Sequence, residues 1–247
     1  MKTVLITGGS RGIGAATARL AAQAGYAVGL SYRQDAAAAA GIVQEIEAAG
    51  GRALAVQADV GDAGDVERLF DTVQTGLGGL HALVNNAGTL ERQARVDELD
   101  AARLQRVLTT NVIGAFLCAG AAVRRLSTRH GGPGGVIVNV SSRAAVLGSG
   151  GEYVDYAASK GAVDTLTVGL AREVAAEGVR VCGVRPGLID TAIHALGGEP
   201  QRVARLAGSV PLGRGGTPDE VAQAVLWLLS PQAAYVTGTT LDVSGGR

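Results

Sequence analysis

Glycines gather in the segment 7–14, which reads TGGSRGIG and lies between a short apolar run and an alanine-rich stretch. Gly8, Gly12 and Gly14 permit a sharp turn, and they let backbone N–H groups approach a phosphate at the start of a helix. The spacing of these glycines is G-x-x-x-G-x-G, whereas the common dinucleotide-binding motif is G-x-G-x-x-G. A glycine-rich turn can also be purely structural, but its place between a strand and a helix favours a phosphate-binding loop.

Two arginines stand where they could recognise a further phosphate. The second apolar run ends in Ser31, Tyr32 and Arg33, without the acidic residue that contacts the ribose 2′-hydroxyl in many NAD-binding folds. Arg33 and Arg11, the latter inside the glycine segment, could instead hold a 2′-phosphate through charge-assisted hydrogen bonds. The alternative is that both are solvated surface arginines. We expect NADP(H) to be preferred, with NAD(H) possible.

Tyr156 and Lys160 lie four residues apart in a segment of helical period, so their side chains share one face. A free tyrosine titrates near pH 10, which is too high for proton transfer at neutral pH. A neighbouring ammonium favours the tyrosinate, so the pair could do acid–base chemistry, although an isolated pair is more often a detail of a helix surface. Tyr153 has Ala157 four positions later, so we expect it to line a pocket or to pack.

Short β-branched runs alternate with longer Ala/Leu-rich segments, which predicts strands and helices in strict succession. The expected strands are 3–7, 27–31, 53–57, 80–84, 136–140, 179–184 and 240–243, and the expected helices are 12–24, 36–49, 63–76, 101–128, 153–177 and 219–229. This order predicts an α/β fold with one doubly wound sheet of about seven parallel strands and helices on both faces. No linker divides residues 1–247, so we expect one domain, with a substrate lid at about 191–216 and a short helix near 201–207.

Composition excludes several classes of protein. The 247 residues carry 22 Lys and Arg against 22 Asp and Glu, so no net charge favours nucleic acid or an anionic membrane. The 38 glycines follow no collagen period, and 47% of the residues are hydrophobic, which argues against disorder. Two cysteines and the lack of a signal-like apolar start indicate a cytoplasmic protein. His81, His130 and His194 do not cluster, so we expect no metal site.

Five motifs occur in the order typical of the short-chain dehydrogenase/reductase family, which the chain resembles along its whole length. They are T-G-x-x-x-G-x-G at 7–14, N-N-A-G at 85–88, L-x-x-N-V ending at Val112, a serine after the fifth strand, and Y-x-x-x-K at 156–160. The runs GEYVDYAASKGA and VRPG resemble the bacterial sugar-dehydrogenase and ketoacyl-reductase-like members. The resemblance implies a Rossmann fold and a homotetramer.

The resemblance also implies catalytic roles. Tyr156 would be the general acid in carbonyl reduction and the base in alcohol oxidation, while Lys160 would also bind the nicotinamide ribose. Ser142 would hydrogen-bond the substrate carbonyl, with Ser141 as the alternative because many relatives have one residue fewer before the tyrosine. Asn111 would kink its helix and hold a water that leads to Lys160, unless it is simply a polar helix residue.

Cofactor contacts follow from the same resemblance. Asp59 and Val60 would contact adenine, although Asp59 could instead cap the next helix; Asn86, Ala87 and Gly88 would lie against the adenosine. The segment after the sixth strand would close over the nicotinamide amide. The full expected set is Gly8, Ser10, Arg11, Gly12, Ile13, Gly14, Arg33, Asp59, Val60, Asn86, Ala87, Gly88, Tyr156, Lys160, Pro186, Gly187, Ile189 and Thr191.

The expected function is an NADP(H)-dependent oxidoreductase that interconverts a small-molecule carbonyl and a secondary alcohol by hydride transfer. A dinucleotide-sensing regulator is the main alternative, but such relatives typically lose the Tyr/Lys pair. A methyltransferase would leave that pair and N-N-A-G unexplained. Cys118 and Cys182 are expected to be packed thiols, and His194 could touch substrate. The two long helices carry extra apolar positions, some of which are expected to pack against the same helices of another subunit: Val112, Phe116, Leu117, Val163, Leu166 and Leu170.

Overall fold

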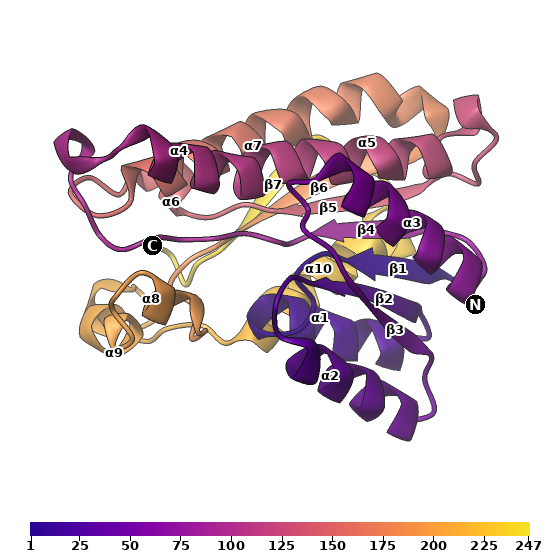
Figure 1. The fold of residues 1–247 in the computed structure, drawn as a ribbon, viewed down its shortest axis with the longest axis horizontal. Coiled ribbons are helices and arrows are strands. Elements are labelled where there is room, and N and C mark those ends of the chain that lie inside the picture. The colour runs from indigo at the N-terminus through magenta and orange to yellow at the C-terminus, as the bar shows by residue number, and fades with distance from the viewer.

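Seven short runs rich in Val, Ile and Leu form a parallel sheet in the computed structural model, which describes residues 1–247 (Figure 1). The strands are β1 (Thr3–Ile6), β2 (Ala27–Tyr32), β3 (Ala53–Gln57), β4 (Ala82–Asn85), β5 (Gly135–Val140), β6 (Val179–Pro186) and β7 (Thr240–Val243). Their order is β3-β2-β1-β4-β5-β6-β7, and every neighbouring pair is parallel. The predicted fold class is confirmed.

Helices cover both faces of the sheet because successive strand side chains point to opposite faces. On one face lie α1 (Gly12–Gln23), α2 (Ala36–Ala48) and α10 (Pro218–Leu229), and on the other lie α3 (Ala63–Leu77), α4 (Ala101–Leu108), α5 (Gly114–Leu126) and α7 (Val154–Val174) (Figure 1). Val4 and Ile6 of β1 enter the core on the α1 side, while Leu5 between them enters the core on the α3 side. Two separate cores therefore hold the sheet.

Short helices lie beyond the carboxyl ends of the strands. They are α6 (Ala144–Leu147), α8 (Ile193–Leu196) and α9 (Arg202–Leu206); the last lies where a short helix is expected. In Figure 1, α8 and α9 form a lobe at the lower left, set apart from the helices that cover the sheet. Single 3₁₀ turns complete the structure: Val96–Glu98, Thr128–His130, Ala175–Glu177, Ala207–Ser209 and Pro231–Ala233.

The long helix expected at 101–128 is interrupted. A π-helical turn, Thr109–Ile113, separates α4 from α5, and α5 ends at Leu126. Such turns insert an extra residue into a helix and are frequent at functional sites. By length and composition alone the run Ala101–Leu126 could span a membrane, and 44% of its most apolar window is buried inside the protein.

Two other boundaries differ from expectation. The strand expected at 80–84 begins at Ala82, because Gly78 and Gly79 have φ values of 81° and 115° and the chain is still turning before it. The helix expected at 153–177 has its α-helical part at Val154–Val174 and ends in a 3₁₀ turn. Two of the six residues expected at subunit contacts are also buried within the chain: Val163 and Leu166 pack with Ala115 and Ala119 between α5 and α7.

Candidate active site

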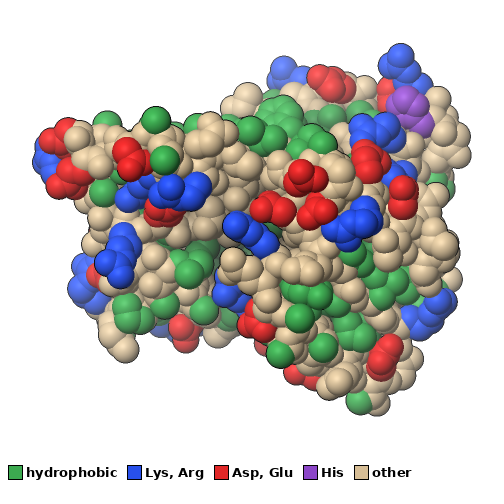
Figure 2. Space-filling model, in the orientation of Figure 1, with side chains coloured by type: hydrophobic (Ala, Val, Ile, Leu, Met, Phe, Trp, Pro, Cys, Tyr) green, Lys and Arg blue, Asp and Glu red, His purple; other side chains and the backbone are tan.

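A cavity of about 780 Å³ opens at the carboxyl ends of the strands. It runs from the loop between β1 and α1, past the ends of β2 to β6, to the short helices α6 and α8. Figure 2 shows the molecule hollowed on this side, between the α4 end and the α8–α9 lobe. Open α/β sheets bind their ligands at this edge.

The glycine segment forms the floor of one end. Gly8 and Gly12 have φ values of 64° and 53°, which glycine adopts readily. A Cβ at Gly14 would lie 2.3 Å from the Gly8 carbonyl oxygen and 2.6 Å from Nδ2 of Asn86, so no larger residue fits there. The start of α1 is thereby left open toward the cavity, where Gly8, Ser10, Arg11, Gly12 and Ile13 line the wall.

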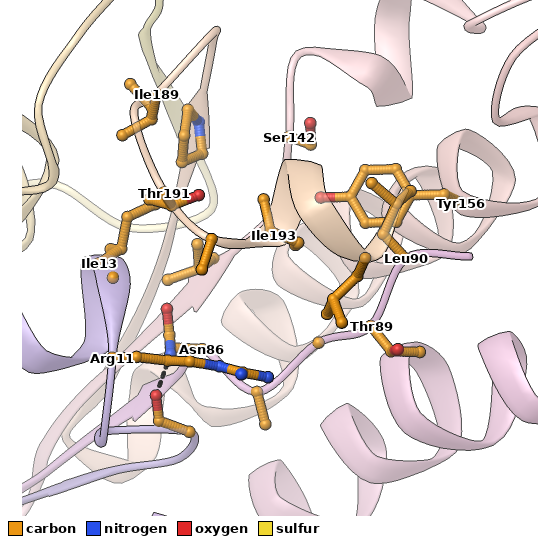
Figure 3. Close-up of a pocket in the computed structure, with 18 of the residues that line it drawn as sticks. Arg11, Ile13, Asn86, Thr89, Leu90, Ser142, Tyr156, Ile189, Thr191 and Ile193 are labelled. Atoms are coloured by element: carbon orange, nitrogen blue, oxygen red, sulfur yellow. Dashed lines mark hydrogen bonds between the residues drawn. The ribbon is translucent and has the colours of Figure 1, made fainter. Parts of the chain in front are cut away.

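The turn after β4 is fastened to this glycine segment. Asn86 donates from Nδ2 to the carbonyl oxygens of Thr7 and Gly8, at 2.8 and 3.0 Å, and the backbone N–H groups of Asn86 and Ala87 both donate to the Thr7 hydroxyl at 2.9 Å (Figure 3). The amide of Asn86 is therefore used to shape the loop. The N-N-A-G and glycine motifs form one rigid unit.

Charged side chains lie at the outer end of the cavity. Arg11 reaches across it below Asn86 and has no ionic partner, while Arg33 lies 3.4 Å from the carboxylate of Asp59 (Figure 3). Asp59 accepts the Gly61 N–H at 2.9 Å and does not cap the following helix. The cap of α3 is Asp62, which accepts the Asp65 N–H at 2.8 Å. The capping alternative for Asp59 is therefore wrong.

Ser142 and Tyr156 meet at the inner end. In Figure 3 the Tyr156 hydroxyl, from the first turn of α7, is directed toward Ser142, which follows the end of β5. The Ser142 hydroxyl accepts the Ala144 N–H at 3.1 Å. Burial raises the pKa of the Tyr156 phenol above its ordinary value, and the Ser142 hydroxyl beside it opposes that rise. Ser141 is turned away, because its hydroxyl donates to the backbone carbonyl of Lys160 at 3.1 Å. The geometry favours Ser142 over Ser141 as the serine that a substrate would meet.

Lys160 lies one turn further along α7 and is buried. Its Nζ donates to the backbone carbonyl of Val140 at 2.8 Å and lies 5.7 Å from the centre of the Tyr156 ring. Burial lowers the pKa of Lys160 to about 8, against the opposing pull of Asp164. The lysine is thus charged at neutral pH and close to the phenol, in a setting where charge is poorly screened.

Asn111 lies in the π-helical turn, and its side chain is fully hydrogen-bonded. Oδ1 accepts the Thr89 N–H at 2.7 Å, and Nδ2 donates to the Thr89 carbonyl and to the Ser159 hydroxyl, each at 3.0 Å. Ser159 in turn donates to the carbonyl of Tyr156 at 2.7 Å. The side chain of Asn111 therefore ties the loop after β4 to the first turn of α7.

A buried ion pair supports the tyrosine from behind, and sequence reasoning missed it. Arg103 on α4 binds Asp155 through Nε–Oδ2 at 2.8 Å and Nη2–Oδ1 at 3.3 Å, and it also donates to the Arg92 carbonyl at 2.7 Å. Asp155 directly precedes Tyr156 and accepts its N–H at 2.9 Å. The only sign of this ion pair in the sequence is the acidic residue beside Tyr156, and one acidic residue does not indicate where its partner lies.

The segment after β6 crosses the cavity. Gly187 donates its N–H to the Val243 carbonyl at 2.9 Å, and Ile189 pairs with Gly216 in a short parallel bridge. Thr191 then comes close to the glycine segment, because its Cγ2 lies 3.3 Å from where a Cβ on Gly12 would be. Pro186, Gly187, Ile189 and Thr191 all line the cavity, as do Asp59, Val60, Asn86, Ala87 and Gly88.

The α8–α9 segment is fastened beside the tyrosine by a buried arginine. Arg202 on α9 forms ion pairs with Glu152 and Glu199, and its guanidinium lies 5.1 Å from the centre of the Tyr153 ring. Tyr153 is buried, and its hydroxyl donates to the Gly197 carbonyl at 3.2 Å. Tyr153 thus both lines the cavity and packs.

The cysteines are buried as expected, and burial raises the pKa of Cys118 to about 12, which makes its thiol unreactive. His194 lines the cavity, and its Nε2 lies 2.8 Å from the Ile189 carbonyl, whereas its Nδ1 is buried without a partner. Burial lowers the pKa of His194, so it is neutral at pH 7.

The parallel sheet and the Ser-Tyr-Lys cluster at the ends of its strands define a class of oxidoreductase. A family model described as Enoyl-(Acyl carrier protein) reductase matches residues 8–247. With this match and the relatives below, the chain belongs to the short-chain dehydrogenase/reductase family, whose members are oxidoreductases acting on CH–OH groups.

Curated relatives match along their full length. The chain is 55% identical over 247 residues to an uncharacterized oxidoreductase of Escherichia coli, with both chains covered completely. It is 42% identical over 246 residues to the 3beta-hydroxysteroid dehydrogenase 1 of Eggerthella lenta, covering 99% of this chain and 93% of that protein. It is also 39% identical to a 3-oxoacyl-[acyl-carrier-protein] reductase of Synechocystis, covering 99% and 96%.

Solved structures agree with this assignment. A short chain dehydrogenase from Burkholderia cenocepacia in complex with NADP has a TM-score of 0.91 and 36% identity, covering 99% of this chain and 97% of that one. A 3-ketoacyl-(acyl-carrier-protein) reductase from Brucella melitensis complexed with NADH also has a TM-score of 0.91, with 32% identity and coverage of 100% and 98%.

Proposed function

We propose that this oxidoreductase uses NADP(H) in preference to NAD(H) to interconvert a small-molecule carbonyl and a secondary alcohol, with Tyr156 as the general acid and base. One observation carries the proposal. The cavity joins an open glycine turn, at one end, to Ser142, Tyr156 and Lys160 at the other. Residues 1–247 act as a single dinucleotide-binding domain, with 191–216 as its lid.

The residues present fit a dinucleotide. The glycine turn approaches so closely that a Cβ at Gly14 would overlap the Gly8 carbonyl, so the start of α1 can receive a pyrophosphate with its backbone N–H groups. Arg11 and Arg33 supply positive charge at the outer end for a 2′-phosphate. One solved relative is in complex with NADP and another is complexed with NADH, so the comparisons favour neither cofactor. The proposed preference for NADP(H) therefore rests on these two arginines. When bound, the dinucleotide supplies or accepts the hydride.

The side chains divide the remaining work. Ser142 hydrogen-bonds the carbonyl oxygen of the substrate, and Tyr156 protonates that oxygen during reduction or removes the hydroxyl proton during oxidation. Lys160 favours the tyrosinate through its positive charge and binds the nicotinamide ribose. In reduction the carbonyl carbon gains the hydride while its oxygen takes the tyrosine proton, so the carbonyl becomes an alcohol.

Resupply of that proton needs a path to solvent. The side chain of Asn111 is already used by Thr89 and Ser159, so the water that leads to Lys160 is held through the backbone of the π-helical turn. A π turn supports this role because it disturbs the ordinary pairing of helix carbonyls.

The assembly we propose is a homotetramer in the cytoplasm. Phe116 and Val168 remain exposed on α5 and α7, and apolar side chains gather over these two helices in Figure 2. Exposed apolar area of this kind marks contacts between subunits. The buried, unpaired thiols of Cys118 and Cys182 suit a reducing compartment.

The test is Tyr156→Phe, which removes one oxygen and keeps the ring. Loss of general acid catalysis should lower kcat by at least about 100-fold on a panel of carbonyls, with NADPH affinity little changed. A Tyr153→Phe variant is the matched control and should keep most of the activity. If Tyr156→Phe keeps most of its activity, Tyr156 is not the acid. A protein that binds NADPH but turns over no carbonyl would be the dinucleotide-sensing regulator.

A further inference from the structure

Charge is divided unevenly along the cavity. At its outer end, Arg11 has no ionic partner and Arg33 has only an exposed contact with Asp59. At its inner end, beyond Ser142 and Tyr156, the walls that a substrate would meet are mostly hydrocarbon. They are formed by Leu90, Leu147, Tyr153, Ile193 and Leu196. Figure 3 places Leu90 and Ile193 beside the Tyr156 ring.

Apart from Arg247, which forms no ion pair, the cations at this inner end already have partners. Arg202 has a carboxylate on each side, from Glu152 and Glu199, and its flat face lies on Tyr153. Arg143 donates to the Asp242 carboxylate at 2.7 Å and to the Arg247 carbonyl at 2.6 Å. Lys160 is occupied by the Val140 carbonyl and the proposed ribose contact. His194 is neutral at pH 7. A negatively charged substrate group beside these walls would therefore lose its hydration without gaining a free cation from Arg202, Arg143 or Lys160.

The rim of the cavity is apolar as well. Leu147 on α6 is 50% exposed and Leu196 on α8 is 44% exposed, and they belong to the two short helices that border the opening. Large aliphatic side chains left in water at the mouth of a binding site favour a ligand that covers them.

We propose that the substrate is an uncharged, largely hydrocarbon ketone or secondary alcohol, whose body lies against Leu90, Leu147 and Leu196 while its oxygen meets Ser142 and Tyr156. This inference rests on the function proposed above. It excludes substrates that place a carboxylate or phosphate against these apolar walls.

Two ketones with the same ring test the idea: ethyl 4-oxocyclohexanecarboxylate, which is neutral, and 4-oxocyclohexanecarboxylate, which is an anion. Loss of NADPH absorbance gives kcat and KM for each. The ester should have a kcat/KM at least about 10-fold higher, because the anion must bury an unpaired charge. Equal values for the two ketones would overturn the proposal.

A charge placed on the wall sharpens the test. Leu147→Lys should raise kcat/KM for the carboxylate by about 5-fold, since a partly exposed ion pair contributes modestly, and should lower kcat/KM for the ester, which loses an apolar contact. Leu212→Lys is the matched control, because Leu212 is exposed and does not line the cavity. If Leu147→Lys and Leu212→Lys behave alike, the ring does not lie against Leu147 and the proposal fails.

The remaining arginine at this end also has to be tested. The guanidinium of Arg247 lines the cavity and has no ionic partner. If Arg247→Gln selectively removes activity on the carboxylate, the site recognises anions and the proposal is overturned. Reduction of an acetoacetyl thioester but of neither ring would also overturn it, while leaving carbonyl reduction intact. Failure to oxidise NADPH with any carbonyl would contradict the proposed function itself.

Discussion

The proposed preference for NADP(H) rests above all on the side chain of Arg33. Arg33 directly follows β2, and its side chain is 61% exposed. Its contact with the Asp59 carboxylate is long, at 3.4 Å. A weak, solvated pair is easily exchanged for a phosphate with full negative charge, since charge-assisted bonds to phosphate are short and strong. Arg11 faces the same end of the cavity from the glycine segment.

We expect Arg33→Asp to reverse the cofactor preference. It removes a favourable contact and adds repulsion against the 2′-phosphate, so the NADPH/NADH affinity ratio should fall by about 10- to 100-fold or more. Titration of reduced-cofactor fluorescence measures both affinities. Arg19→Gln, which changes an exposed arginine paired with Glu45 outside the cavity, should leave the ratio as it is. An unchanged ratio in Arg33→Asp would show that Arg33 does not contact the phosphate.

The pH dependence of the reaction follows from Tyr156 and Lys160. Burial raises the pKa of Tyr156, so the phenol persists to higher pH and the phenolate forms only above it. Alcohol oxidation, which needs the phenolate as base, should therefore rise with pH through one ionisation. Carbonyl reduction, which needs the phenol, should fall over the same range. Burial lowers the pKa of Lys160, but a phenolate beside it favours the ammonium, so the lysine keeps its charge as the phenolate forms.

Pre-steady-state rates of oxidation and reduction between neutral and alkaline pH would check this. The change in rate with pH that comes from the ionisation of Tyr156 should be absent in Tyr156→Phe. In Lys160→Met it should move to higher pH, because the positive charge that favours the phenolate is gone. Parallel profiles for oxidation and reduction would contradict the assignment of one group to both directions.

At the scale of the elements, α4 holds the tyrosine helix and the loop after β4 together. Arg103 and Arg106 lie on the same side of α4, and both bind carboxylates. The Arg103–Asp155 pair is buried, with side-chain exposures of 11% and 2%, whereas Arg106 pairs with Glu91 in solvent. The two arginines therefore offer the same chemistry in two environments.

Arg103→Met should destabilise the protein by about 3–5 kcal/mol, because it leaves the Asp155 carboxylate buried and unpaired. Arg106→Met, the matched control, should cost far less, since water and salt screen its pair. Urea denaturation followed by circular dichroism measures both. Similar losses in the two variants would mean that the burial of Asp155 is not what makes the pair important.

Elements were more predictable than contacts. The strands and helices follow from local patterns, such as the exact bounds of β3 and β7. The resemblance predicted a kink at Asn111, but not the hydrogen bonds of its side chain to Thr89 and Ser159, which are distant in the chain. The sequence also could not tell which apolar residues of the long helices pack within the chain, as Val163 and Leu166 do, because an apolar residue on a helix does not reveal where its partner lies. The motifs located the site, but the role of Ser141 required the hydrogen bond to Lys160.

At the scale of the whole molecule, the proposed tetramer rests on the exposed apolar face of α5 and α7. Phe116 is 52% exposed at its centre. We expect light scattering at micromolar concentration to give a mass near four times the 24.8 kDa of one chain. Phe116→Glu should shift the protein toward smaller species, because a buried carboxylate opposes close packing.

Val96→Glu is the matched control, since Val96 is exposed in a 3₁₀ turn between β4 and α4. It should leave the mass unchanged. A wild-type mass near that of one chain would contradict the tetramer.

The strand order has a consequence for how the chain folds as it is synthesised. β1 lies in the middle of the sheet, paired with β2 on one side and with β4 on the other. β2 follows β1 closely, but β4 comes about 80 residues later, which at about 5–20 residues per second means several seconds of synthesis. Throughout that interval one edge of β1 has no partner, and an apolar unpaired strand is prone to aggregate. The N-terminal third of a nascent chain is therefore the part most in need of a chaperone.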